Sequence, residues 1–225
     1  MRICVIIPTY NESRAIADLI NQIAKLGLEV IIIDDGSSDN TVKIATACGA
    51  KVLPNLKNMG KGASLIKGYN FALQHGFDAV VSMDGDGQHS PSDLPAFIQK
   101  AKTSASALIV GNRMGMTKTM PVLRQITNFL MSKFISLIVK QHIPDTQCGF
   151  RLAKKELLSK IGLSTSKYET ESEVLIKAAR LGFKIESIPV ETIYSGQKSQ
   201  INPLVDSLRF LRFMIREFTR EPKHA

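Results

Sequence analysis

The chain has 225 residues, of which 44% are hydrophobic, so it can bury a sizeable core without covalent or metal cross-links. Its 29 Lys and Arg residues outnumber 20 Asp and Glu residues, and the formal net charge of +9 favours polyanionic partners. The basic residues are dispersed, Trp is absent and only 6% of residues are aromatic, which argues against a nucleic-acid-binding protein.

Cysteine usage and hydropathy bear on the compartment. Three cysteines, an odd number without a CxxC pair, do not indicate a disulfide framework and favour a reducing environment. The apolar run at residues 3–7 is too short for a signal peptide, and polar residues interrupt the most apolar longer segment, 122–139. We therefore expect a cytoplasmic protein, soluble or peripheral on the inner face of the cytoplasmic membrane.

Short β-branched runs alternate with helical patterns over the first 85 residues. Strands are expected at 3–7, 29–34, 51–53 and 79–83, and the helices between them at about 16–26, 38–48 and 63–74. This alternation predicts an α/β fold with a doubly wound, Rossmann-like, open and mostly parallel sheet flanked by helices.

The pattern becomes less regular after residue 85. Further helices are expected at about 92–102, 122–140, 171–181 and 203–219, and further strands at 107–110 and 184–194. No internal repeat or long linker divides the chain. We expect one domain over residues 1–200, followed by a basic amphipathic helix and tail over residues 201–225.

Polar, acidic turns follow three of the predicted strands: Pro8 to Glu12, Asp34 to Ser37, and Asp84 to His89. Ligands of open α/β sheets bind at the carboxyl ends of the strands, so these turns should converge. A divalent cation would offset the repulsion between carboxylates and recruit phosphate. Asp84 and Asp86, separated by glycine, suit Mg²⁺ or Mn²⁺, although an isolated run of this kind is also typical of a plain turn.

A glycine-rich segment, Gly60-Lys61-Gly62, opens the third predicted helix. Its backbone N–H groups and Lys61 could contact the phosphate or base of a nucleotide. An ordinary helix start explains the same residues equally well, and the spacing does not match a P-loop. His89, directly after the acidic turn, is a candidate third metal ligand or phosphate contact.

Together these motifs resemble the family 2 glycosyltransferases, and more closely their dolichol- or polyprenol-phosphate mannosyl- and glucosyltransferase branch. Five further motifs match that branch in order, and the likeness covers roughly residues 2–215: Gly111 to Arg113, Asp145 to Arg151, Glu171 to Glu173, Ile193 to Gly196, and Lys198-Ser199. The resemblance implies a GT-A fold and an inverting, metal-dependent transfer of a hexose from a GDP- or UDP-sugar. The implied acceptor is polyprenyl or dolichyl phosphate, or another cell-envelope glycan precursor.

The resemblance also implies roles for individual residues. The base and ribose would contact Pro8, Tyr10, Glu12 and Asp35, the metal Asp84 and Asp86, and the donor and acceptor phosphates Gln88, Arg113 and Arg124. The chain lacks the QxxRW element of processive members, which argues against polymer synthesis. It also lacks the C-terminal membrane spans that many polyprenol-phosphate enzymes carry, so the acceptor stays open.

The chemistry of transfer suggests further assignments. A leaving diphosphate needs positive charge, which the metal and a side chain such as Arg113 or Lys198 can provide. A phosphate acceptor needs no general base, whereas a hydroxyl acceptor would require one, and the candidates are Asp145, Glu171 and Glu173. The two-residue spacing of Glu171 and Glu173 predicts that the helix begins between them. Alternatively, both simply stabilise a helix N-terminus.

Other positions keep two interpretations. Arg124 is either a phosphate contact or a solvated helix charge, and Arg151 either binds substrate or pairs with nearby acids. The segment 122–139 is either a core helix or an interfacial helix facing a lipid acceptor, and the helix at 203–219 either contacts an anionic membrane or packs on the domain. For the whole chain, the alternatives are transfer to a sugar hydroxyl, nucleotidyl transfer, and a basic non-catalytic membrane-surface binding module.

Overall fold

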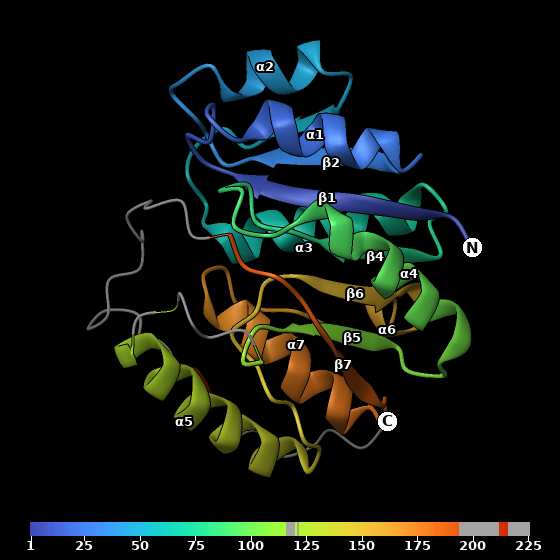
Figure 1. Cartoon of the computed structure of the whole chain (residues 1–225), viewed down its shortest axis with the longest axis vertical. Helices are drawn as coiled ribbons and strands as arrows, with labels where there is room; N and C mark the ends of the chain where they lie inside the picture. The colour runs from blue at the N-terminus through green and yellow to red at the C-terminus, as the bar shows by residue number, and fades with distance from the viewer. Residues whose placement is uncertain (116–119, 121, 194–211, 216–225) are drawn as a thin grey trace.

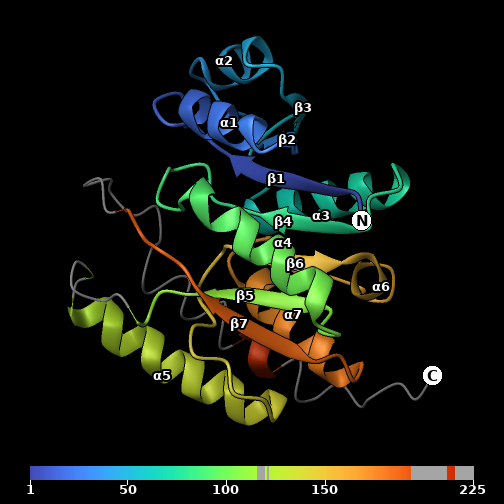
Figure 2. The ribbon, with the colours of Figure 1, turned by 45° about the vertical axis from the view of Figure 1, so that its right-hand side comes forward.

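The computed structural model describes residues 1–115, 120, 122–193 and 212–215, without the side chains of residues 123 and 124. Seven strands form one sheet in the order β3-β2-β1-β4-β6-β5-β7 (Figure 1). Helices α1, α2 and α4 lie on one face of this sheet, and α3, α6 and α7 lie on the other (Figure 2). The predicted α/β class is confirmed.

The first half of the chain forms four mutually parallel strands of the sheet. Its elements are β1 (Ile3–Thr9), α1 (Ile16–Lys25), β2 (Glu29–Asp34), α2 (Thr41–Ala47), β3 (Lys51–Pro54), α3 (Lys61–Gln74) and β4 (Ala79–Ser82). Strands β1 and β2 are buried along most of their length because helices cover both faces, which explains their nearly continuous Ile and Val runs. Thr9 pairs with Asp34 at the carboxyl ends of these strands, so the turns that follow emerge side by side.

The second half is less regular. It comprises η1 (Pro91–Asp93), α4 (Leu94–Thr103), β5 (Leu108–Asn112), α5 (Val122–Val139), β6 (Arg151–Lys154), α6 (Lys155–Leu158), α7 (Glu169–Arg180) and β7 (Ile185–Pro189). Strand β6 lies between β4 and β5 and runs antiparallel to both. The sequence pattern did not predict this strand, because it is only four residues long and a charged residue stands at each end.

Two predicted boundaries differ from the structure, and one prediction lies mostly outside the described residues. Helix α7 begins at Glu169, ahead of both Glu171 and Glu173, so the expected junction between them is wrong. Strand β7 ends at Pro189, and beyond it Thr192 pairs with His89 as an isolated bridge. Of the helix expected at 203–219, only residues 212–215 are described, and they are helical.

Helix α5 lies at the margin of the molecule beside α7 (Figures 1 and 2). Its polar residues Asn128 and Ser132 are buried, and the backbone N–H of Thr146 donates to Ser132 Oγ over 2.9 Å. Ile135 and Val139 are buried as well, but six large apolar side chains of the helix are exposed: Val122, Ile126, Phe129, Leu130, Phe134 and Leu137. Their three- and four-residue spacing places them along one stripe, so the exposed face of α5 is unusually apolar for a surface helix.

No helix within the described ranges combines the length and the apolar character that crossing a membrane requires.

Candidate active site

The acidic turn after β4 packs against the turn after β1. A Cβ atom on Gly85 would lie 2.9 Å from Thr9 Cγ2 and 3.4 Å from Glu12 Cγ, so only glycine allows this approach. Within the turn, the backbone N–H of Gln88 donates to Asp86 Oδ1 over 3.0 Å, which fixes the Asp86 side chain. The predicted convergence of Glu12, Asp84 and Asp86 is therefore present in the fold.

The three carboxyl groups raise one another's cost of ionisation. Burial, followed by the charges of Asp86 and Asp84, raises the pKa of Glu12 to about 7. Burial and the neighbouring Asp84 also raise the pKa of Asp86. Negative charge at this edge of the sheet is thus only partly compensated by the protein itself.

Asp84 is the exception, because Lys61 neutralises it. Lys61 Nζ lies 2.5 Å from Asp84 Oδ1 and 2.7 Å from Glu171 Oε1, so the ammonium bridges the acidic turn and helix α7. Burial opposes ionisation of Asp84, but the Lys61 charge outweighs it and lowers the pKa of Asp84 to about 2. Gly149 lies beside this pair, since a Cβ there would be 2.9 Å from both Asp84 oxygens.

The backbone of the glycine-rich segment has protein partners. Asp35 accepts hydrogen bonds from the N–H groups of Met59 and Gly60 over 2.8 and 2.7 Å, and Ala63 N–H donates to Ser166 O over 3.0 Å. Thr170 Oγ1 occupies the space that a Cβ on Gly62 would need. These contacts favour the ordinary helix start over a phosphate cradle for the backbone, while the Lys61 side chain reaches the acidic turn.

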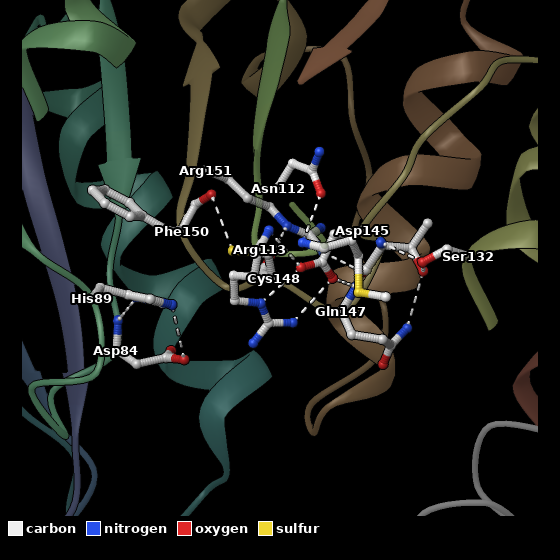
Figure 3. A network of polar contacts seen from close by, with 12 residues as sticks. Asp84, His89, Asn112, Arg113, Ser132, Asp145, Gln147, Cys148, Phe150 and Arg151 are labelled. Carbon is white, nitrogen blue, oxygen red and sulfur yellow. Dashed lines mark hydrogen bonds and ion pairs between the residues drawn. The ribbon is translucent and has the colours of Figure 1, made fainter. Parts of the chain in front are cut away.

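Arg113 and Asp145 form a two-pronged ion pair (Figure 3). Arg113 Nε donates to Asp145 Oδ2 over 2.7 Å, and a terminal nitrogen donates to Oδ1 over 3.0 Å. The Asp145 side chain has no exposed surface, and the backbone N–H of Gln147 also donates to its Oδ1. Asp145 is therefore unsuited to act as the general base that the sequence suggested, and it orients Arg113 instead.

Arg151 is buried and binds backbone carbonyl groups. It donates to the oxygens of Cys148 and Thr146, both over 2.8 Å, and to the Glu171 oxygen over 2.6 Å. The suggested pairing of Arg151 with acidic side chains is therefore not what the structure contains. Arg151 joins the loop before β6 to the first turn of α7.

The two glutamates of α7 have different surroundings. Glu171 contacts Lys61, whereas Glu173 is fully buried and accepts hydrogen bonds from Ser164 and Thr165 as well as an ion pair from Lys177. Burial works against the charge of Glu173, but its ion pair with Lys177 and hydrogen bonds from Thr165 and Ser164 lower its pKa to about 2. Glu173 therefore stabilises the loop before α7 and is not positioned as a base.

His89 is buried beside Asp84 and stacks on Phe150, with ring centroids 5.1 Å apart (Figure 3). The backbone N–H of Asp84 donates to His89 Nδ1 over 3.1 Å. Burial lowers the pKa of His89, which favours the neutral ring. Because Nδ1 already accepts a hydrogen bond, only Nε2 is left for the metal or phosphate contact that the sequence suggested, and that contact stays a prediction.

The remaining predicted residues are placed less fully. Pro8, Tyr10 and Gln88 are half-buried on the two facing turns, and the Gln88 carbonyl accepts a hydrogen bond from Ile193 N–H over 2.9 Å. The Arg124 side chain and Lys198 lie outside the described residues. Gly149 and Phe150 belong to the site without having been assigned roles beforehand, although they stand inside a motif that the sequence had marked.

Comparison with known proteins identifies the family. Residues 4–162 match the model of the glycosyl transferase family 2. A relative from Methanococcus voltae, UDP-N-acetylglucosamine–dolichyl-phosphate N-acetylglucosaminyltransferase, is 32% identical over 86% of this chain and 86% of its own length. The undecaprenyl-phosphate mannosyltransferase of Micrococcus luteus is 28% identical over 84% of this chain and 83% of its own length.

Solved structures agree on the fold. Glucosyl-3-phosphoglycerate synthase from Mycobacterium tuberculosis, crystallised with Mn²⁺, UDP-glucose and phosphoglyceric acid, superposes with a TM-score of 0.78 at 22% identity. The match covers 99% of this chain and 81% of that one. The open sheet, the converging acidic turns and the family match lead to one assignment. The chain belongs to the family 2 glycosyltransferases and is an enzyme with the GT-A fold.

Proposed function

We propose that this enzyme transfers a hexose, with inversion, from a nucleotide diphosphate sugar to polyprenyl phosphate at a membrane surface. The observation that carries the proposal is the state of the three carboxylates expected to serve as a general base. Asp145 and Glu173 are fully buried and bonded by several groups, and Glu171 is paired with Lys61. An acceptor phosphate is already ionised and needs no base, so it suits such a site.

A divalent cation is part of the proposal. No three His, Cys, Asp or Glu side chains cluster as a metal site within the described part of the chain. Two carboxylates, Asp84 and Asp86, nevertheless match the way Mg²⁺ and Mn²⁺ bind when a substrate phosphate completes the coordination. Burial and then repulsion from Asp84 raise the pKa of Asp86, and a bound cation would relieve that repulsion, which supports this assignment. When bound, the cation would neutralise charge on the leaving diphosphate.

The chain's own residues then have separate tasks. Glu12, Asp35, Pro8 and Tyr10 are assigned to the donor side, where Asp35 acts through the loop it holds. Arg113, fixed by Asp145, carries positive charge on the other side of the acidic turn. The proposal assigns Gln88, Arg124 and Lys198 to the phosphates.

The names of the relatives support a lipid acceptor, since those from M. voltae and M. luteus are named for transfer to dolichyl and undecaprenyl phosphate. The exposed apolar face of α5 supports the same conclusion. Its exposed apolar stripe is suited to the interfacial region of a bilayer, and the net charge of +9 would favour anionic lipids. We therefore assign the enzyme to a peripheral position on the membrane.

The direct test is a transfer assay with UDP-N-acetylglucosamine, UDP-glucose and GDP-mannose, each with Mn²⁺ or Mg²⁺ and with EDTA. Undecaprenyl phosphate and undecaprenol serve as matched acceptors that differ only in the phosphate. We expect metal-dependent transfer of one sugar to the phosphate and none to the alcohol. Transfer to the alcohol alone would overturn the phosphate acceptor.

The membrane assignment has its own test. Replacing Phe129 and Leu130 by Ser shortens the exposed stripe of α5 without touching its buried side. We expect weaker co-flotation with vesicles containing anionic lipid and a lower rate with vesicle-borne acceptor, but an unchanged rate with a short-chain, water-soluble polyprenyl phosphate. Equal loss with both acceptors would indicate damage to the site instead.

Transfer to a hydroxyl is the second candidate, and Glu12 is the observation that favours it. Its pKa of about 7 would allow it to accept a proton near neutral pH. A bound cation would lower that pKa again by offsetting Asp84 and Asp86, which weakens this alternative. An activity profile that rises through pH 7 and flattens in Glu12→Gln would favour the hydroxyl acceptor.

A further inference from the structure

His89 is attached to Asp84 in a way that defines the protonation of its ring. A backbone N–H can only donate, so the Nδ1 atom that faces Asp84 N–H at 3.1 Å must be an unprotonated acceptor. The neutral ring therefore carries its proton on Nε2. That nitrogen lies 4.0 Å from Asp84 Oδ2, so the N–H dipole faces the carboxylate from beyond hydrogen-bond distance (Figure 3).

The ring cannot easily move away from this position. Its side chain is only 3% exposed, and it stacks on Phe150 with planes inclined by 23°. Phe150 in turn packs on Phe97, with ring centroids 4.4 Å apart. On the backbone side, His89 pairs with Thr192, and Gln88 O accepts from Ile193 N–H. Two distant segments of the chain therefore hold His89 against the acidic turn.

Asp84 is consequently restrained at three points. His89 binds its backbone N–H, Lys61 binds Oδ1 over 2.5 Å, and His89 Nε2 faces Oδ2. Lys61 supplies charge, whereas His89 fixes the main chain from which the carboxylate projects. A carboxylate whose orientation is set before its ligand arrives loses less conformational entropy on binding.

We propose that His89 is a positioning residue that orients Asp84 for the divalent cation, through the hydrogen bond accepted by Nδ1. This inference rests on the proposed function, in which Asp84 and Asp86 hold that cation. It assigns no direct contact between His89 and the metal. Residues of this kind typically change metal affinity by about 10- to 100-fold when they are replaced.

Two variants separate the hydrogen bond from the bulk of the ring. His89→Asn keeps an acceptor near the position of Nδ1, whereas His89→Leu fills much of the same space without one. Mn²⁺ binding to the full chain is measured from the electron paramagnetic resonance of free Mn²⁺, alone and with UDP or GDP. We expect about 10- to 100-fold weaker binding in His89→Leu and a clearly smaller loss in His89→Asn.

The outcomes are distinguishable. If the wild-type protein binds no Mn²⁺ under any of these conditions, the proposed metal site fails and the inference fails with it. If the wild type binds Mn²⁺ and His89→Leu binds it equally well, only the inference fails, even when the melting temperature falls. Equal losses in the two variants would also overturn it, because the acceptor would then not matter.

A measurement on the wild-type protein covers the case in which His89→Leu does not fold. The ¹⁵N shifts of the His89 ring report which nitrogen carries the proton. We expect an unprotonated Nδ1 and a protonated Nε2 in the metal-free protein. A protonated Nδ1 would break the hydrogen bond from Asp84 and overturn the inference.

Discussion

Two groups of carboxylates meet at the carboxyl edge of the sheet, and their electrostatic surroundings are opposite. Glu12 and Asp86 are buried close to other acids, so their pKa values are raised. Asp145 and Glu173, from the second half of the chain, are also buried, but cations and N–H or O–H groups surround them. Burial alone therefore does not distinguish a ligand-binding carboxylate from a structural one.

The two groups differ in whether the protein or a bound ligand compensates the carboxylate charge. Where the protein supplies every partner, as for Glu173, the carboxylate contributes to folding and has no capacity left for a substrate. Where the described residues supply a single hydrogen bond, as Gln88 N–H does for Asp86, the fold tolerates a cost that a bound cation can remove. Replacing one residue from each group should therefore affect different quantities.

The largest expected effect is on catalysis by Asp86→Asn. This variant keeps the shape of the side chain but removes half of the proposed carboxylate pair. We expect transfer to fall by about a hundredfold or more, the range for losing a principal electrostatic contact to the transition state. Because the raised pKa of Asp86 indicates that its charge opposes folding, thermal unfolding should show no loss of stability. Retained activity would contradict the metal assignment.

For Glu173→Gln we expect lower folding stability and an unchanged rate of catalysis. The amide cannot accept the bonds from Ser164 and Thr165 and pair with Lys177 as the carboxylate does. We expect urea unfolding at pH 7 to show a loss on the order of 3 kcal/mol, as when one member of a buried pair is removed. The folded variant should keep its turnover rate. Glu156→Gln, at an exposed position on α6, is the matched control and should leave both quantities unchanged.

The smallest expected effect is on the pH dependence of folding stability, and it has opposite signs for Glu173 and Glu12. The pKa of Glu173 is lowered from 4.5 to about 2, so its stabilisation is complete above pH 4.5 and is lost as pH falls toward 2. The pKa of Glu12 is raised from 4.5 to about 7, so its ionisation destabilises the fold increasingly as pH rises across that range.

In EDTA, Glu12→Gln should therefore equal the wild type near pH 4.5 and exceed its stability above pH 7 by about 1 to 3 kcal/mol. The measurement is urea unfolding at pH 4.5, 6 and 8. A gap between the two proteins that narrows as pH rises would refute the proposed repulsion around Glu12.

Most of the fold could be predicted from local patterns. The Ile and Val runs of β1 and β2 are long enough to mark buried parallel strands, and their ends identify the edge where ligands bind. Strand β6 could not be predicted in this way, because four residues carry little periodicity and its pairing with β4 joins distant parts of the chain.

The sequence identified most residues of the site but not the ion pairs that they form. The motifs identified Asp84, Asp145 and Glu171 as members, yet nothing local indicates that Lys61 pairs with Asp84 and Glu171, or Arg113 with Asp145. Such partners are set by the packing of α3 on α7 and by the loop that leads into β6. The sequence therefore overestimated the number of available bases.

The reversed direction of β6 also affects how the enzyme can diversify. The chain leaves the sheet after β5 at the carboxyl edge, passes through α5, and re-enters at the same edge because β6 begins there. Residues 113–150 therefore connect β5 to β6, and the two ends of this connection are close together. The contacts that hold it, Arg113 with Asp145 and Ser132 with Thr146, join residues within the connection itself. Insertions or deletions within this connection can remodel the surface proposed to face the acceptor while every strand pairing of the sheet stays in register.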